Sequence, residues 1–378
     1  MSVAAPAASP SHGQLADSPT EIPPRGWRDV GWRLIHEVME DRVMLIAAGA
    51  TYYMLIALVP GLALFVSLYG LFNDPVDVYK QVSLLSGILP QGGLDILTDQ
   101  LTRLAATGKP TLGVTLLVSL AIALWSANAG VQAFFDAMNI AYDEAEKRNF
   151  LVRTGLGFIF TLGFAIAAIL FLAVVIVIPV ALQFLYLGHG FDWLVKVASY
   201  VLMLILMMGG ISALYRWGPS RSEAKWRWVT PGAALAVVGI AIVSVVFSWY
   251  AANFSNYNAT YGSLGALIGF LTWMWLSATV VIVGAELDSE LEHQTAKDST
   301  TGAPLPLGAR GAYMADHVAV VGQGAAADGK GFDGAMPKPH APAGAKSDLV
   351  LGLGLFALLV MASAGASRAG GVRPARSP

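Results

Sequence analysis

Long apolar segments fill most of the first three-quarters of this chain and restrict it to one class of fold. Each is at least as long as the ~20 residues that a helix needs to cross a ~30 Å hydrocarbon core. Backbone groups in lipid must be paired within the segment or in a closed barrel, and long segments without strict alternation favour helices. The sequence therefore predicts an all-α, polytopic membrane bundle with six core transmembrane helices. The segments are Val43–Phe72, Thr111–Phe135, Thr154–Leu187, Trp193–Leu214, Val229–Ala251 and Tyr261–Ala285.

The composition agrees with a protein that is solvated largely by lipid. Hydrophobic residues make up 56% of the 378 residues and charged residues 13%, about half the charged share of soluble domains. Cysteine is absent, which excludes disulfides, thiol nucleophiles and cysteine metal sites. The N-terminal segment lacks the short apolar core of a signal peptide, so we expect the first spanning helix to direct insertion.

Basic residues near the helix ends predict the orientation, because cytoplasmic connections carry an excess of Lys and Arg. They concentrate before the first segment and in every second connection: Arg25, Arg28, Arg33, Arg42, Lys147, Arg148, Arg153, Arg216, Arg221, Lys225 and Arg227. The alternate connections hold fewer: Lys80, Arg103, Lys109 and Lys196. We expect a multi-pass protein of the bacterial plasma (inner) membrane, with its N-terminus in the cytoplasm.

Four parts are expected along the chain. Residues 1–42 form a cytoplasmic N-terminal segment, and residues 43–291 form the six-helix domain. Residues 292–348 form a tail rich in Gly, Ala and Pro, which we predict to be disordered. Residues 349–378 hold a short apolar helix and a basic terminus. Whether the run Leu349–Ala364 spans as a seventh helix or lies at the interface is left open.

The connection from Asn73 to Pro110 is too long for a turn and has apolar residues at helical spacing. Val78, Val82, Leu85 and Leu89 form one such series. We predict amphipathic surface helices between the first two spanning helices, which either gate an opening or anchor the surface.

A stripe of polar residues follows one face of the second segment. Asn128, Gln132, Asp136 and Asn139 are spaced by four, four and three residues. Polar groups at membrane depth are costly unless they face partners or water, so these residues are the candidate polar path. The alternative is that Asn128 and Gln132 join neighbouring helices by hydrogen bonds.

Cations alternate with aromatic rings in the connection before the fifth segment. Tyr215, Arg216, Trp226 and Arg227 are the candidate interface residues, because indole favours the headgroup boundary and guanidinium pairs with phosphate. Ordinary topological anchoring is the alternative.

A third set of residues is assigned to helix packing or gating. Prolines can kink membrane helices, small residues allow close approach, and aromatic residues at mid-helix pack against neighbours. Glu286 ends the sixth segment in an acidic run, but no catalytic residue, metal site or cofactor is predicted. The set is Pro60, Pro179, Tyr261, Gly262, Trp273 and Glu286.

Several motifs together resemble the YihY/virulence factor BrkB family of bacterial inner-membrane proteins. They are AAGATYYMLIALVP at 47–60, LWSANAGVQAFFDAMNIAYDEAEKRNF at 124–150, Tyr215-Arg216 with Pro219, WRWVTPG at 226–232, and the run from Tyr261 to Glu286. The resemblance implies six transmembrane helices with cytoplasmic termini. It implies little about activity: family members were formerly labelled ribonuclease BN, and it carries no catalytic residues over to this chain.

The leading functional hypothesis is a transporter or flippase-like carrier of a lipid or another amphiphilic envelope component. Its partners are membrane lipids and a lipid or envelope-precursor substrate, and no nucleic acid is expected. The alternative is a non-transporting envelope scaffold. A membrane-bound ribonuclease is the third hypothesis, and it would depend on Glu286.

Overall fold

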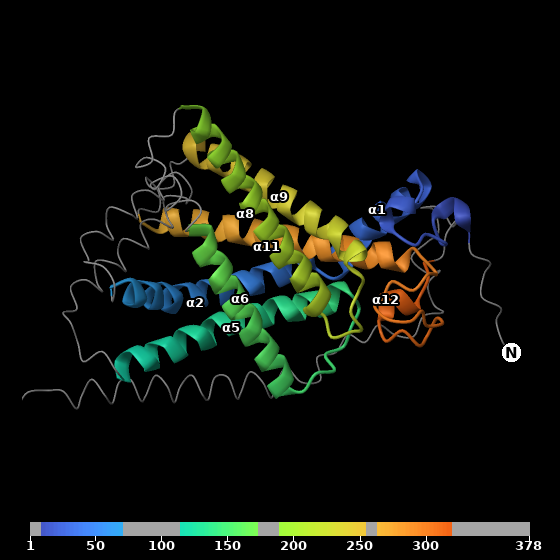
Figure 1. Ribbon diagram of the computed structural model, residues 1–378, viewed down its shortest axis with the longest axis horizontal. Helices are drawn as coiled ribbons and strands as arrows, with labels where there is room; N and C mark the ends of the chain where they lie inside the picture. Colours follow the sequence, from blue (N-terminus) through green and yellow to red (C-terminus); the bar gives the residue numbers. More distant parts are fainter. Residues whose placement is uncertain (1–8, 71–113, 173–188, 255–262, 320–378) are drawn as a thin grey trace, which may run out of the picture. The chain divides into compact units, whose positions relative to one another are not determined.

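Six long helices occupy the positions where the sequence predicts spanning segments. In this computed structural model the described residues are 9–70, 114–172, 189–254 and 263–319, all within the unit Met1–Lys338, and they contain helices and no strand beyond an isolated bridge. The six long helices are α2 (Val43–Gly70), α5 (Val114–Ala141), α6 (Phe150–Leu172), α8 (His189–Trp217), α9 (Trp226–Phe254) and α11 (Ser263–His293) (Figure 1).

A multi-pass membrane protein is supported by the length and apolarity of these helices. Four of them, α6, α8, α9 and α11, are long and apolar enough within the described residues to cross a membrane. The bent pair formed by α1 (Pro24–Glu40) and the first part of α2 is a fifth candidate. The all-α membrane class is therefore confirmed, while the count of six spans stays a prediction.

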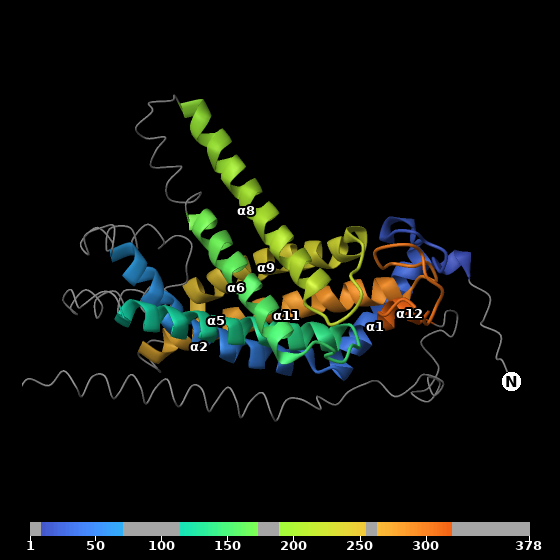
Figure 2. The same cartoon turned by 60° about the horizontal axis from the view of Figure 1, so that its bottom comes forward.

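Helix packing concentrates the buried core at one end of the bundle. The helix α2 packs along α5 and α11, and α11 packs along α9, whereas α6 crosses α5 and α8 contacts α9 over part of its length (Figures 1 and 2). We call the end that carries the connections 142–149 and 218–225 the basic end. Its core contains Phe135, Met138, Tyr142, Tyr215 and Ile282. Elsewhere α6, α8 and α9 expose large apolar side chains, as expected of surfaces that face lipid.

Close contact between α9 and α11 depends on glycine. A Cβ on Gly232 would clash with the Gly284 carbonyl, and a Cβ on Gly284 would clash with the Tyr215 hydroxyl. The same hydroxyl donates a hydrogen bond to the Val281 carbonyl at 2.5 Å. Tyr215 therefore ties α8 to α11 and is a core residue at this end of the bundle.

The N-terminal segment contains a helix that the sequence analysis did not identify. Short 3-10 helices at Pro10–His12 and Pro19–Glu21 precede α1. The axis of α1 is bent by 60° from that of α2. The bend falls at Asp41 and Arg42, where Arg42 has a left-handed φ of 52°, and α2 then continues as helix past Pro60. The break is thus before α2, the first predicted spanning helix, and not at Pro60.

Part of the predicted disordered tail is folded, and that expectation is wrong up to residue 319. The Arg310 side chain donates to the carbonyls of Ala296, Lys297, Leu305 and Ala315 and organises this segment. A short helix, α12 (Tyr313–Asp316), follows. The prediction of disorder from the Gly, Ala and Pro content failed because one buried arginine can order such a loop by binding its carbonyl groups.

The N-terminal segment and the folded tail are also joined to each other. The Gln14 side chain donates to the Ala319 carbonyl at 2.7 Å, and the Gln294 side chain donates to the His12 carbonyl at 2.7 Å. Both segments therefore enclose the end of α11. The predicted surface helices within 73–110, Pro179, Tyr261, Gly262 and the run 349–364 lie outside the described residues.

Candidate functional site

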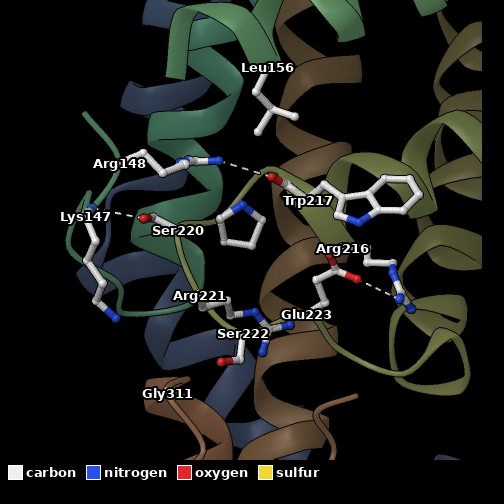
Figure 3. Close-up of a pocket in the computed structure, with 11 residues that line it drawn as sticks. Lys147, Arg148, Leu156, Arg216, Trp217, Ser220, Arg221, Ser222, Glu223 and Gly311 are labelled. Atoms are coloured by element: carbon white, nitrogen blue, oxygen red, sulfur yellow. Dashed lines mark hydrogen bonds and ion pairs between the residues drawn. The ribbon is translucent and has the colours of Figure 1, made fainter. Parts of the chain in front are cut away.

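A cavity of about 550 Å³ opens at the basic end, between the connections 142–149 and 218–225 and the first turns of α6. Its lining combines cations, hydroxyl groups and an indole ring (Figure 3). The lining residues are Lys147, Arg148, Leu156, Arg216, Trp217, Pro219, Ser220, Arg221, Ser222, Glu223 and Gly311. Four of these are cations, and Glu223 is the one acid among the described residues that line the cavity.

Arg216, at the end of α8, is held over two indole rings. Its guanidinium lies 4.7 Å from the ring centroid of Trp226 and 5.5 Å from that of Trp217. It donates to the Ala224 carbonyl at 2.7 Å and to the Glu223 carboxylate at 2.8 Å. Its Nε has no hydrogen-bond partner among the described residues. The side chain is 11% exposed and that of Glu223 is 47% exposed, so the carboxylate is the more easily displaced partner.

Arg148 connects the two loops that form the cavity. It pairs with Glu146 through Nε and Nη2, each at 2.8 Å, and donates to the carbonyls of Trp217 and Gly218 at 3.2 Å and 2.7 Å. Although partial burial acts against ionisation, hydrogen bonds from Arg148 and Asn139 lower the pKa of Glu146 from 4.5 to about 2. The pair is therefore ionised at neutral pH.

Beneath the cavity, Arg221 is fully buried and paired with Glu292 of α11. Burial disfavours its charged form, but the adjacent Glu292 carboxylate more than offsets this and holds the pKa of Arg221 above its usual range. The guanidinium also lies 4.1 Å from the ring centroid of Tyr142, and burial raises the pKa of the Tyr142 hydroxyl well above its usual value. Arg221 thus fixes the loop 218–225 to α11.

The predicted polar stripe meets α6 and the loop before α9. Arg153 donates to Gln132 Oε1 at 2.5 Å and to the Asp136 carboxylate at 2.7 Å, and Gln132 donates to the Arg153 carbonyl at 3.0 Å. Asn128 is 5% exposed, and its amide oxygen has no hydrogen-bond partner among the described residues. The first three stripe residues therefore lie in a helix–helix contact in this conformation.

Asn139 has a different position from the rest of the stripe. Its oxygen accepts from the Ser220 backbone N–H at 2.7 Å, and its nitrogen donates to Glu146 at 3.0 Å. Ser220 and the Glu146 partner Arg148 both line the cavity. Asn139 consequently positions the cavity walls from α5.

The other predicted residues are distributed over the bundle. Trp226 packs edge-on against Trp217 with ring centroids 5.5 Å apart, and Arg227 is exposed outside the cavity lining. Trp273 donates to Ser244 at 3.1 Å and so joins α11 to α9. Glu286 is 1% exposed and does not line the cavity. Of the four predicted interface residues, Arg216 alone lines the cavity directly.

Sequence reasoning missed several cavity residues. In the sequence, Lys147 and Arg148 indicate only orientation, and no pattern marks Ser220, Ser222 or Gly311 as site residues. Gly311 reaches the cavity because its carbonyl accepts from the Ser222 backbone N–H at 3.0 Å. This contact joins positions 89 residues apart and depends on the unpredicted folding of the tail. Within the described ranges, no group of three or more His, Cys, Asp or Glu residues is arranged to hold a metal ion.

Most of the chain matches one family of known proteins. A family model described as Virulence factor BrkB matches residues 34–305. The putative ribonuclease-like protein YfkH of Bacillus subtilis is 29% identical over 260 residues, which is 65% of this chain and 88% of YfkH. The UPF0761 membrane protein XAC0937 of Xanthomonas axonopodis pv. citri is 30% identical over 268 residues, 69% of this chain and 60% of that protein. The chain thus spans less than two-thirds of the Xanthomonas relative. No solved structure matches the chain.

Proposed function

The chain belongs to the virulence factor BrkB family of membrane proteins, and we propose that it carries a lipid or another amphiphilic envelope component with an anionic headgroup. The observation behind this proposal is the cation- and indole-lined cavity at the basic end. Its volume falls in the range of small-molecule sites, roughly 300–1,000 Å³. We place this end at the cytoplasmic face of the bacterial plasma membrane, following the excess of Lys and Arg in its connections.

The chemistry of Arg216 supports a phosphate ligand. The residue is nearly buried, rests on two indole rings and has an unpaired Nε–H within the described residues. A phosphate that replaces the half-exposed Glu223 carboxylate would gain a charge-assisted bidentate contact, while Glu223 would return to water. Exchange of one anion for another avoids leaving an uncompensated buried cation.

The walls of the cavity also suit an amphiphile. Leu156 of α6 and Trp217 of α8 both line it. Beyond them, the two helices expose apolar side chains, including Ile159 at 67% and Ile205 at 60%. In this proposal the headgroup occupies the cavity while the acyl chains remain against the apolar surfaces of α6 and α8.

Transbilayer movement of acyl-labelled phosphatidylglycerol in proteoliposomes, followed by quenching with a membrane-impermeant reductant, tests the proposal. We expect movement with the wild type and a several-fold slower rate with Arg216→Gln. Arg227→Gln is the matched control, because Arg227 is an exposed cation outside the cavity. Equal rates in all three proteins would contradict the role of the cavity, and no movement in any would reject spontaneous scrambling of this lipid.

The polar stripe on α5 is proposed as the path beyond the cavity. For Asn128, Gln132 and Asp136 to hydrate a headgroup, α6 would have to separate from α5 and break the Arg153 hydrogen bonds. The Asn128→Leu/Gln132→Leu double variant, with insertion and folding verified, should bind lipid at the cavity but move it more slowly. An unchanged rate would remove the stripe from the path.

The same hydrogen bonds support a second candidate function, a non-transporting envelope scaffold. Arg153 satisfies Gln132 and Asp136 in the way expected of polar residues that fix helix association. A scaffold should keep its envelope phenotype in the Asn128→Leu/Gln132→Leu variant and lose it when residues 73–110, which the sequence predicts to form surface helices, are shortened.

We propose that the chain is not an enzyme. The words ribonuclease-like in the name of YfkH describe that relative and are not carried over to this chain. Burial of Glu286 supports this assignment, since a catalytic carboxylate has to reach its substrate. Purified protein should cleave no RNA with or without divalent cations. Metal-dependent cleavage that Glu286→Gln abolishes would overturn the proposal.

A further inference from the structure

The helix α1 has two chemically distinct faces. One face is fixed to the end of α11: Val30 is fully buried, and Arg33 pairs with Glu290 and donates to Gln294 at 2.7 Å. Gly26 is buried against the His12 carbonyl, where a Cβ would clash. These contacts set the rotation of α1 about its axis and therefore decide which residues point outward.

The outward face carries five residues at spacings of three, four, three and four. They are Arg25, Arg28, Trp32, Ile35 and Met39, and we call this set the α1 surface stripe. Residues at these intervals lie along one side of a helix. Trp32 and Ile35 are each 51% exposed, Met39 is 70% exposed, and both arginines are exposed. The stripe contains no acidic residue, so it is cationic at its start and apolar at its end.

The apolar end of the stripe is followed by exposed apolar residues at the start of α2, a predicted spanning helix. After the 60° bend at Asp41 and Arg42, the first turn of α2 exposes Met44 at 60% and Leu45 at 66%. Met39 and these two residues lie on either side of the bend. With α2 as a spanning helix, as the sequence predicts, a helix inclined to it by 60° is oblique to the bilayer normal.

We infer that α1 is an interfacial helix that lays the α1 surface stripe on the anionic lipids of the adjacent leaflet. Trp32, Ile35 and Met39 would enter the boundary between headgroups and acyl chains, as apolar faces of interfacial helices do. Arg25 and Arg28 would bind lipid phosphates further from the bend. This surface is separate from the cavity and does not depend on the proposed transport.

Charge and position favour lipid over a second copy of the chain as the partner. Two copies related by a two-fold axis would bring equivalent stripes together, with Arg25 and Arg28 unopposed by acids on either stripe. Lipid phosphates supply the missing negative charge. The partner of the α1 surface stripe is therefore a bilayer that contains anionic phospholipid.

The depth of α1 in a bilayer can be measured directly, because the chain contains no cysteine. Single cysteines at Ile35 and at Thr20, an exposed position before α1, would carry a nitroxide in the full-length protein. The vesicles contain phosphatidylglycerol and phosphatidylcholine in equal amounts. We expect oxygen to outcompete a water-soluble nickel chelate at position 35, with a collision ratio several-fold above that at position 20. Equal ratios at the two positions, or spin–spin broadening at position 35, would overturn the inference.

The lipid class is tested with the arginines. In the nitroxide-labelled Ile35→Cys protein, Arg25→Gln/Arg28→Gln should lower the collision ratio and abolish its dependence on phosphatidylglycerol. Lys297→Gln is the control, since it removes an exposed cation that is not part of α1. All these side chains are exposed, so folding should be retained, and the melting temperature checks this. An unchanged ratio in the double variant, or no difference between vesicles with and without phosphatidylglycerol, would overturn the assignment to anionic lipid.

Discussion

Arg221 and Glu292 form a bidentate ion pair with both side chains fully buried, at N–O distances of 2.7 Å and 2.9 Å. The pair joins the loop after α8 to the last turn of α11. Ser299, in the folded part of the tail, adds a hydrogen bond to the same carboxylate at 2.6 Å. The loop after α8, the end of α11 and the start of the folded tail therefore meet at one buried charge pair, which fixes the floor of the cavity.

Breaking this pair from one side should be strongly destabilising. Arg221→Met leaves the Glu292 carboxylate buried and uncompensated, and such changes cost about 3–5 kcal/mol. The double variant Arg221→Met/Glu292→Leu should recover much of the loss, because it removes both charges. Thermal unfolding in detergent, followed by tryptophan fluorescence, measures both, and exposed Arg227→Met should stay within about 0.5 kcal/mol of the wild type. A mild effect of Arg221→Met alone would mean that water reaches the pair.

Gly157 and Gly155 form a matched test of the α5–α6 contact. A Cβ at Gly157 would collide with the side-chain amides of Asn128 and Gln132, whereas a Cβ at Gly155 would meet no atom within 4 Å. Gly157→Ala should therefore destabilise the bundle by about 1–3 kcal/mol through overpacking. Gly155→Ala should be neutral or stabilise by up to about 1 kcal/mol, because alanine favours helix. Unfolding in detergent compares the two, and equal effects would contradict the packing of α6 on the stripe.

Apolar length and helical spacing were sufficient to predict the class of fold. The six long helices coincide with the predicted segments because backbone pairing in lipid leaves the chain few alternatives. Helix ends were less accurate: α5 continues to Ala141 and α11 to His293, past the apolar residues. In α11 the added turns are acidic and buried, since Arg33 and Arg221 come from other elements to pair with Glu290 and Glu292. The composition of α11 itself does not indicate that arginines from other elements pair with its acids.

The cavity was only partly predictable for the same reason. Arg216 and its aromatic neighbours were predicted from adjacent positions along the chain. Arg148 and Gly311 belong to the site through contacts with the loop 218–225, at separations that a single sequence does not reveal. The helix α1 was missed because its apolar residues are separated by arginines and glycines, although the spacing of Trp32, Ile35 and Met39 was present in the sequence.

Stability should fall in acid through the Glu146–Arg148 pair. The folded pKa of Glu146 is about 2, below its ordinary 4.5, so the pair stabilises the folded state above about pH 4.5. The contribution declines as the pH falls from 4.5 toward 2, because protonation of the unfolded chain comes first. The Glu146→Gln variant lacks this pH-dependent contribution to stability. The melting-temperature difference between wild type and variant should therefore be largest near neutral pH and shrink in that window, while other acids such as Asp298 cancel from it. A difference that is constant with pH would refute the assignment.

Replacing Arg310 in the folded tail should also loosen the loop 218–225, which lines the cavity. Its guanidinium donates to four carbonyl groups, and the adjacent Gly311 carbonyl and the Thr301 backbone N–H hold the loop 218–225 through Ser222 and Glu223. Arg310→Gln is too short to reach these carbonyls together, so residues 296–316 should exchange backbone hydrogen faster. Because the two segments are hydrogen-bonded, residues 220–225 should exchange faster with them, although no cavity residue has been replaced. Hydrogen exchange with mass spectrometry measures both, with exposed Lys297→Gln as the control. Faster exchange in the tail without any change in the loop would show that contacts outside the tail, such as those of Arg221, Arg148 and Asn139, are sufficient to hold the loop.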